Sequence, residues 1–273
     1  MPSDTNIVMR APVRVVGATL HYLLASAEKP ARYLYDRPGL PQWTGVDDPR
    51  DMAIADARGR EGDFTLDRNG FTLLRAPSGE RQFTDETAIT GAYYDECADI
   101  VRRATGAGRV VVFDHTLRGP NQPRDPVMRV HNDYTEKSAP QRIRDLVPAE
   151  ADALLRHRYV FINVWRPIAN PVIDTPLALC DATSFDEDDL IMTDLVYEDR
   201  VGEIASVRHS PKHRWVFFSH MTPNEVVLIK CHDSARDGRA RISFHSAFVD
   251  PTAPVDAKPR QSIEIRTIAF FDN

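Results

Sequence analysis

Cysteine is scarce in this chain of 273 residues. The three cysteines, Cys97, Cys180 and Cys231, lie far apart, and no two have the CxxC spacing. This argues against a disulfide framework and against a thiolate zinc site. It favours a reducing compartment, and we predict the cytoplasm.

The chain also lacks long apolar runs and a basic excess. No segment reaches the roughly 18 continuous apolar residues of a membrane-spanning helix, and Asp4, Arg10 and Arg14 interrupt the N-terminal stretch where a signal peptide would be apolar. Lys and Arg number 34 against 40 Asp and Glu, which gives a formal charge of -6. That balance argues against nucleic-acid and membrane partners and favours a protein that handles a small molecule.

The first hundred residues predict few regular elements. The pattern FTLDRNGFTLL places Asn69-Gly70 between two β-prone runs, which indicates a hairpin. Thr84 is a candidate N-cap for an amphipathic helix that ends near Gly106. The other segments that we assign here are a strand at 13–16 and a charged, exposed loop at 45–62.

The remainder of the chain reads mainly as strands. A second helical pattern covers residues 139–157, and eight β-prone runs lie around it, at 109–118, 159–165, 176–180, 190–197, 214–218, 225–230, 241–249 and 262–271. Helices early and many short strands later predict an α+β, mainly β protein, in which helices pack outside a β-sandwich or barrel. We find no repeat or linker and predict one domain over residues 1–273. Such a sandwich with helical additions is compatible with a homodimer.

One of the nine histidines lies two residues before a carboxylate, in His131-Asn132-Asp133. Residues i and i+2 of a strand project from the same face, so this imidazole and carboxylate can converge on one ion. A second histidine from a neighbouring strand would complete the two-histidine, one-carboxylate site of iron(II) oxygenases. A surface histidine and aspartate at the end of a strand would give the same pattern, and about one such pair is expected by chance.

The C-terminal segment adds His245 in one β-prone run and Arg260 with Ser262 at the start of the next. Arg260 and Ser262 share a face, where a guanidinium fork and a hydroxyl can anchor a dicarboxylate. Each residue has an ordinary explanation, a core histidine or an edge-strand charge. The joint order, HxD, then His, then RxS, is far more specific.

These residues and the segments around them resemble a known family. The chain resembles the iron(II)/2-oxoglutarate-dependent oxygenases of the group that includes the cephalosporin methoxylase component and fungal hydroxylase/desaturases. The resemblance spans roughly residues 60 to 270, and its matching segments are DHTLR (114–118), VHNDYT (130–135), NVWRP (163–167), PLALCD (176–181), HRWVFF (213–218), EVVLIK with CHDS (225–234), and FHSAF with PRQSIEIR (244–266).

The resemblance implies a double-stranded β-helix (a cupin-like jelly roll) with flanking helices. Its core would cover roughly 108–273, with the N-terminal hairpin and helix packed on it. It also implies His131, Asp133 and His245 as catalytic iron(II) ligands, and 2-oxoglutarate held by Arg260 and assisted by Ser262. The expected reaction uses O2 to hydroxylate, desaturate or cyclise an unactivated C–H position of a small secondary metabolite or amino-acid-derived substrate, with succinate and CO2 as coproducts.

Two further pairs of residues are candidates for the pocket. Asn163 and Trp165 share one face of their strand. We predict Asn163 as a cofactor-pocket residue, because a polar side chain inside a barrel demands a partner, and Trp165 as core. Arg118 and Arg166 are candidate contacts for a substrate carboxylate, or else ordinary ion-pairing residues.

Two histidines compete with this assignment. His213 is a rival third metal ligand, but no Arg-x-Ser follows it on the next strand, so we rank it below His245. His220 stands where the family usually continues with an aromatic residue and a proline, and we interpret it as a surface change.

Two other functions remain as alternatives. One is a jelly-roll ligand-binding protein without catalysis. The other is a metal-dependent hydrolase that uses a zinc-bound water. Against the hydrolase, the sequence has no HExxH motif, and Arg260 and Ser262 would have no assigned purpose.

Overall fold

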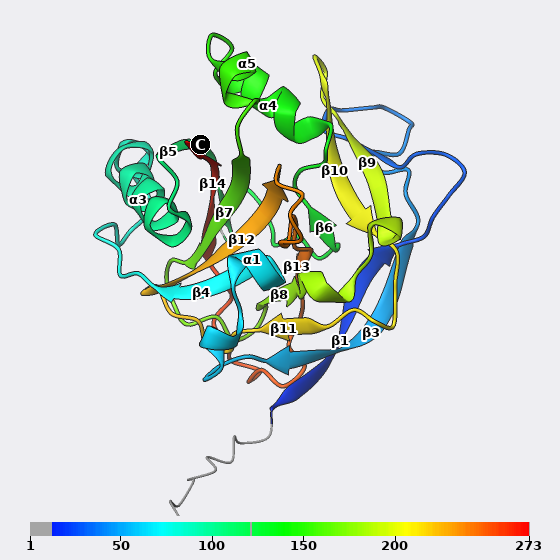
Figure 1. Ribbon diagram of the computed structural model, residues 1–273. Helices are drawn as coiled ribbons and strands as arrows, with labels where there is room; N and C mark the ends of the chain where they lie inside the picture. The colour runs from blue at the N-terminus through cyan, green and yellow to red at the C-terminus, as the bar shows by residue number, and fades with distance from the viewer. Residues whose placement is uncertain (1–12, 121, 273) are drawn as a thin grey trace, which may run out of the picture.

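Two curled β-sheets face one another in the structure, a computed structural model that describes residues 13–120 and 122–272 (Figure 1). Asp4 and Arg10, on which the expectation about a signal peptide partly rests, lie outside these residues. The sheets form the predicted mainly β, jelly-roll architecture, and helices cover its outside. In the described part of the chain, no helix combines the length and the apolar character needed to cross a membrane.

The larger sheet has nine strands in the order β1-β3-β11-β8-β13-β6-β10-β9-β2. Its two central strands, β13 and β6, are very short, and they lie where the sheet curls over its partner (Figure 1). The strand bounds are β1 Val15–Leu23, β2 Ala31–Tyr33, β3 Asp47–Asp56, β6 His131–Asn132, β8 Leu177–Cys180, β9 Leu190–Val196, β10 Val201–Val207, β11 Trp215–Phe217 and β13 His245–Ala247.

The smaller sheet has five antiparallel strands in the order β4-β12-β7-β14-β5. Its strands are β4 Phe71–Arg75, β5 Arg109–Arg118, β7 Tyr159–Pro167, β12 Glu225–Asp233 and β14 Ser262–Phe270. The central strand β7 is buried along its whole length, because both of its faces are covered. Alternate residues face the other sheet, as Phe161 and Trp165 do, or the helical side, as Ile162 and Val164 do.

Helix α3 (Tyr94–Thr105) packs on the outer face of the five-stranded sheet (Figure 1). Its apolar side, which includes Cys97, Ile100 and Val101, meets outward residues of β7 and β14. Helices α4 (Ser138–Leu146) and α5 (Ala151–Leu154) lie at one end of the sheets (Figure 1). The other helical segments are α1 Leu66–Asn69, α2 Glu86–Ala88, a π-helix at Ile89–Tyr93, and 3₁₀ turns at Glu61–Asp63, Ala182–Ser184 and Glu187–Asp189.

The predicted hairpin at 64–74 is wrong. The Thr65 side chain accepts a hydrogen bond from the Arg68 backbone N–H, at 3.2 Å, so it caps the short helix α1. Gly70, with φ of +82°, ends that helix. Only the second run forms a strand, β4, and its partner is the distant β12.

The predicted loop at 45–62 is also wrong, because β3 occupies its centre. This strand pairs with β1 along its length and with β11 on the other side. Both of its edges are therefore hydrogen-bonded, although its charged side chains make it look like a loop.

Four other boundaries differ from the predictions. The strand expected at 13–16 begins at Val15 and runs to Leu23. Asp85, not Thr84, is the N-cap of the helical segment that ends at Gly106. The helix expected over 139–157 is divided in two, and Pro148 lies between the parts, where its ring and missing N–H interrupt a helix. The β-prone run at 241–249 is a regular strand only at His245–Ala247.

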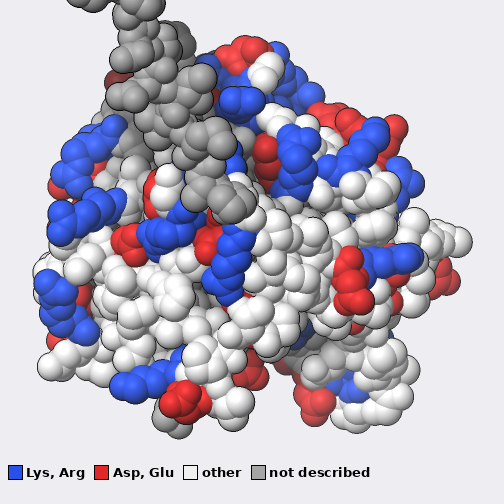
Figure 2. All heavy atoms as spheres, turned by 90° about the horizontal axis from the view of Figure 1, so that it is seen from below, with Lys and Arg blue, Asp and Glu red and all other residues white. Residues whose placement is uncertain are grey.

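Charged side chains are mixed on the face of the molecule seen in Figure 2. Lys and Arg lie beside Asp and Glu, with broad uncharged areas between them. This mixed surface agrees with the similar numbers of basic and acidic residues in the sequence.

Candidate metal centre and co-substrate pocket

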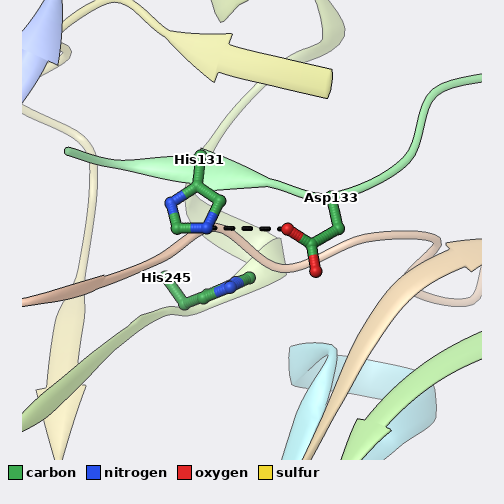
Figure 3. A group of neighbouring side chains, drawn as sticks. All are labelled: His131, Asp133 and His245. Atoms are coloured by element: carbon green, nitrogen blue, oxygen red, sulfur yellow. Dashed lines mark ion pairs between the residues drawn. The ribbon is translucent and has the colours of Figure 1, made fainter. Parts of the chain in front are cut away.

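Neighbouring strands bring His131 and His245 together. They are direct register partners on the antiparallel strands β6 and β13, and their ring centroids are 4.4 Å apart. Asp133 directly follows β6, and its Oδ1 lies 3.6 Å from His131 Nε2. One potential ligand atom from each of the three side chains lies within 4.8 Å of the others, and the side chains converge in Figure 3.

Hydrogen bonding leaves a ring nitrogen of each histidine directed into this group. His131 Nδ1 lies 2.8 Å from the Arg129 carbonyl oxygen, which can only accept, so Nδ1 carries the proton. Burial is the main cause that lowers the pKa of His131 to about 3, so the ring is neutral at neutral pH. Its Nε2 lone pair therefore faces the Asp133 carboxylate. Both atoms are hydrogen-bond acceptors, so neither can donate to the other.

His245 also has a buried ring nitrogen that faces this group. It is 3% exposed, and its buried Nε2 has no hydrogen-bond partner among the described residues. A buried, unpaired polar atom is unfavourable. A cation between the three side chains would satisfy His245 Nε2 and would separate the two facing acceptors. Two imidazoles and a carboxylate are also the donor set of the iron(II) oxygenases, so the residues present fit that metal.

The second oxygen of Asp133 is held from the opposite sheet. Oδ2 accepts hydrogen bonds from Asn163 Nδ2 at 2.8 Å and from Arg266 Nε at 3.3 Å. Burial raises the pKa of Asp133, but the opposing effect of Arg266, followed by that of the two histidines, outweighs it and lowers the pKa below its ordinary value. Asp133 is therefore a carboxylate, as a metal ligand must be.

A cavity opens beside the three residues. Its volume is about 280 Å³ including its open mouth, and His131, His245, Trp165, Arg118 and Arg260 contribute to its wall. It is the natural place for a small co-substrate, because it borders the candidate ligands directly.

Arg260 lies in this wall and forms no ion pair with a carboxylate of the described residues. It is 5% exposed, its Nε donates to Ser262 Oγ at 3.2 Å and its Nη1 to the Thr175 carbonyl oxygen at 3.0 Å, and its guanidinium lies 5.1 Å from the Trp165 ring centroid. Burial, and then the charge of Arg118, lowers the pKa of Arg260 to about 10, so it remains charged at neutral pH. A buried cation without an ion pair is costly, and a carboxylate ligand would compensate for it.

Arg118 adds a second cation to the same wall. Its Nη1 donates to the Asp125 carbonyl oxygen at 2.8 Å, and it too has no ion pair with an acid of the described residues. Burial, partly offset by Glu264, lowers its pKa. Glu264 also contributes to this wall, but its carboxylate is hydrogen-bonded to Arg266. Two guanidinium groups that form no ion pair with an acid of the described residues make this part of the cavity suited to an anionic ligand.

The other candidate residues lie elsewhere. The Asn163 amide contacts Asp133 rather than the cavity. Arg166 is fully buried beneath α3, where it donates to Tyr93, Glu96 and the carbonyl oxygens of Ala76 and Pro223. That arrangement matches the ion-pairing alternative and removes Arg166 as a substrate contact.

Neither rival histidine joins the group. His213 lies against Tyr22 and Asp189, with its Nδ1 3.2 Å from Tyr22 Oη. His220 is exposed, with φ of +52°, and lines a separate cavity. Among the residues that the structure describes, His131, Asp133 and His245 form the one cluster of three metal-binding side chains.

Glu264 and Arg266 were not predicted as residues of the site from the sequence. In the run RQSIEIR, alternate positions from Arg260 to Arg266 are polar, and this face of β14 points into the space between the sheets. An uninterrupted polar face on an otherwise apolar strand is the signal that could have identified both residues.

Comparison with known proteins agrees with this geometry. A family model described as "Oxidoreductase/YMDC permease-like domain" matches residues 20–270, so the chain belongs to that family. The Fe(II)/2-oxoglutarate-dependent dioxygenase nvfI of Aspergillus novofumigatus is 34% identical over 249 residues, which are 86% of this chain and 88% of that protein. The protein is an iron(II)/2-oxoglutarate-dependent oxygenase.

Other relatives of this oxygenase carry related names. The hydroxylase/desaturase efuI of Hormonema carpetanum is 32% identical and the match covers 81% of this chain and 84% of the relative. A solved structure of the iron and alpha-ketoglutarate-dependent endoperoxidase NvfI superposes with a TM-score of 0.88, at 29% identity, over 95% of this chain and 99% of its own. The predicted jelly-roll class and the predicted cofactors, iron(II), 2-oxoglutarate and O2, are thereby confirmed. The hydrolase and non-catalytic alternatives are not favoured.

Proposed function

We propose that the oxygenase binds iron(II) through His131, Asp133 and His245 and 2-oxoglutarate through Arg260 and Ser262. The observation that carries this proposal is the electrostatic frustration of the three-residue group. A neutral imidazole nitrogen faces a carboxylate oxygen at 3.6 Å, beside a buried nitrogen with no partner. A divalent cation relieves both conflicts at once.

Each part of the chain then has a defined task. When bound, iron(II) with 2-oxoglutarate supplies the oxidation of a C–H bond by O2, with succinate and CO2 as coproducts. The Arg129 carbonyl oxygen keeps the proton of His131 on Nδ1 and leaves Nε2 for the metal. Arg260 binds the carboxylate of 2-oxoglutarate that is remote from its keto group, and Ser262 orients Arg260. The Trp165 ring packs against Arg260 and excludes water there.

We propose a small secondary metabolite, or a molecule derived from an amino acid, as the substrate. The support is the set of relatives named hydroxylase/desaturase. Oxidation at an unactivated C–H position would give a hydroxylated, desaturated or cyclised product. Arg118 is the cavity residue best suited to contact an anionic group of either substrate or co-substrate.

The cellular setting and the assembly remain proposals. We propose that the protein works in the cytoplasm as a single domain over residues 1–273, without nucleic-acid or membrane partners. Its three cysteines are buried and unpaired, as expected in a reducing compartment. A homodimer is compatible with this fold, and light scattering coupled to gel filtration tests it, since a monomer mass would contradict it.

Anaerobic titration of the iron(II)-loaded protein with 2-oxoglutarate tests the ligand assignment. We expect a visible charge-transfer band of the keto-acid chelate, and we expect His131→Ala and Asp133→Ala to abolish both this band and the turnover of 2-oxoglutarate. His213→Gln is the matched control, since it alters another buried histidine outside the group. Normal turnover in Asp133→Ala would refute the assignment.

A further inference from the structure

The two oxygens of Asp133 have different surroundings. Oδ1 faces His131, and both donors, Asn163 Nδ2 and Arg266 Nε, point at Oδ2. A carboxylate oxygen has two main lone-pair directions, so two donors saturate Oδ2. Oδ1 is left as the oxygen with free acceptor capacity.

Strand register aligns the two donors. Asn163 on β7 and Arg266 on β14 are direct cross-strand partners, and both project from the five-stranded sheet towards the Asp133 carboxylate, which follows β6 of the other sheet. The pair therefore forms a rigid cradle, because each donor is fixed by the pairing of its own strand.

Arg266 is also fixed through the rest of its guanidinium group. Nη1 donates to Asp114 Oδ2 at 2.9 Å and to Thr116 Oγ1 at 3.0 Å, and Nη2 donates to Glu264 Oε1 at 2.9 Å. With its other nitrogens engaged, Arg266 can rotate little, and its Nε–H stays directed at Asp133. These three contacts serve to aim one N–H group.

We propose that Asn163 and Arg266 are positioning residues that restrict Asp133 to binding the iron through Oδ1 alone. This proposal rests on the ligand set proposed above. A facial site of two histidines and one carboxylate leaves three of six coordination positions open, and a keto acid and O2 need all three. Binding through both carboxylate oxygens would occupy one of these positions. Hydrogen bonds to Oδ2 prevent that, and they also orient the ligand.

The test uses Co(II) as a spectroscopic substitute for iron(II), with and without 2-oxoglutarate. We expect Asn163→Leu, which retains the branched shape of the side chain but not its amide, to weaken Co(II) binding about 10- to 100-fold. We also expect it to change the ligand-field bands, which report the coordination number. Arg266→Gln should act in the same direction. Thr267→Val is the matched control, because Thr267 is a buried polar residue beside Arg266 that bonds the Ile162 carbonyl oxygen and not Asp133.

Circular dichroism and thermal melting show which variants are folded before the metal is added. If Arg266→Gln does not fold, Asn163→Leu decides the question alone. Wild-type Co(II) affinity and bands in folded Asn163→Leu, with metal binding lost in Asp133→Ala, would overturn the positioning role and leave the ligand set intact. Wild-type binding in Asp133→Ala would overturn the ligand set as well.

Discussion

Replacing Arg260 with Met should separate binding from stability. Arg260 is buried in the cavity wall, and its polar contacts are a hydroxyl and a carbonyl oxygen, not a carboxylate. A side chain that serves mainly to bind an anionic ligand should be important for that ligand and nearly dispensable for the fold. Arg166 offers a matched comparison, since it is equally buried but paired with Glu96.

The expected magnitudes follow from these contacts. Arg260→Met loses two hydrogen bonds from a charged group, each contributing about 1.5–3 kcal/mol, and it also removes a buried charge whose desolvation is unfavourable by several kcal/mol. We expect these effects to cancel to within about 1.5 kcal/mol in the free energy of unfolding. Arg166→Met instead leaves Glu96 and two carbonyl oxygens without their partner, at a cost of about 3–5 kcal/mol.

Binding of 2-oxoglutarate should show the opposite ranking. Loss of a charged contact at Arg260 weakens binding by about 2–5 kcal/mol, which is about 30-fold or more in Kd. Urea unfolding of the metal-free proteins and anaerobic calorimetric titration of the metal-loaded proteins measure the two effects. The reasoning is refuted if Arg260→Met destabilises the fold as much as Arg166→Met does, or if it binds 2-oxoglutarate as tightly as the wild type.

Three more predictions concern residues outside the cavity wall. Gly70→Ala should lose more stability than Gly106→Ala in thermal unfolding, because an added Cβ at Gly70 would meet Ser243 Cβ at 2.8 Å, whereas nothing lies within 4 Å of an added Cβ at Gly106. The αL conformation costs each variant about 1–2 kcal/mol, so equal losses would contradict the contact argument. His213→Gln should leave iron(II) affinity unchanged in a chelator competition while lowering stability by about 1–3 kcal/mol, and a large loss of affinity would restore His213 as a ligand candidate. Burial raises the pKa of Asp233, but Arg158 and Lys230 outweigh this effect and lower the pKa. The stabilising effect of Asp233 is therefore complete above the unfolded-state pKa of about 3.9 and is lost as pH falls through the lower folded-state pKa. Asp233→Asn should make stability depend less steeply on pH in the acid range, and an unchanged slope would count against this ion pair.

Short-range patterns predicted some elements well and others poorly. The runs that became β7 and β12 were evident because both faces of these strands are apolar for most of their length. The failure at 45–62 has the opposite cause. Strand β3 has mostly solvated side chains, and its backbone partners β1 and β11 lie at other places in the chain. Local sequence carries no information about such pairing.

That missed strand also supports the candidate metal centre. Asp47, at the start of β3, accepts two hydrogen bonds from the Arg129 guanidinium, at 2.8 and 2.9 Å. The Arg129 carbonyl oxygen in turn orients His131. A segment interpreted as an exposed loop thus helps to hold a candidate ligand, through a contact between residues that are distant in sequence.

The order of chemical groups along the chain was enough to suggest the reaction class. The donor types can be identified from the HxD motif, the later histidine and the Arg-x-Ser pair. Donor type determines which metal and which co-substrate a site can hold. Which atoms are free to act was decided by packing alone. The proton position on His131, the unpaired nitrogen of His245 and the engaged oxygen of Asp133 all depend on partners from other strands, because hydrogen bonding and burial are properties of the folded neighbourhood rather than of the residue.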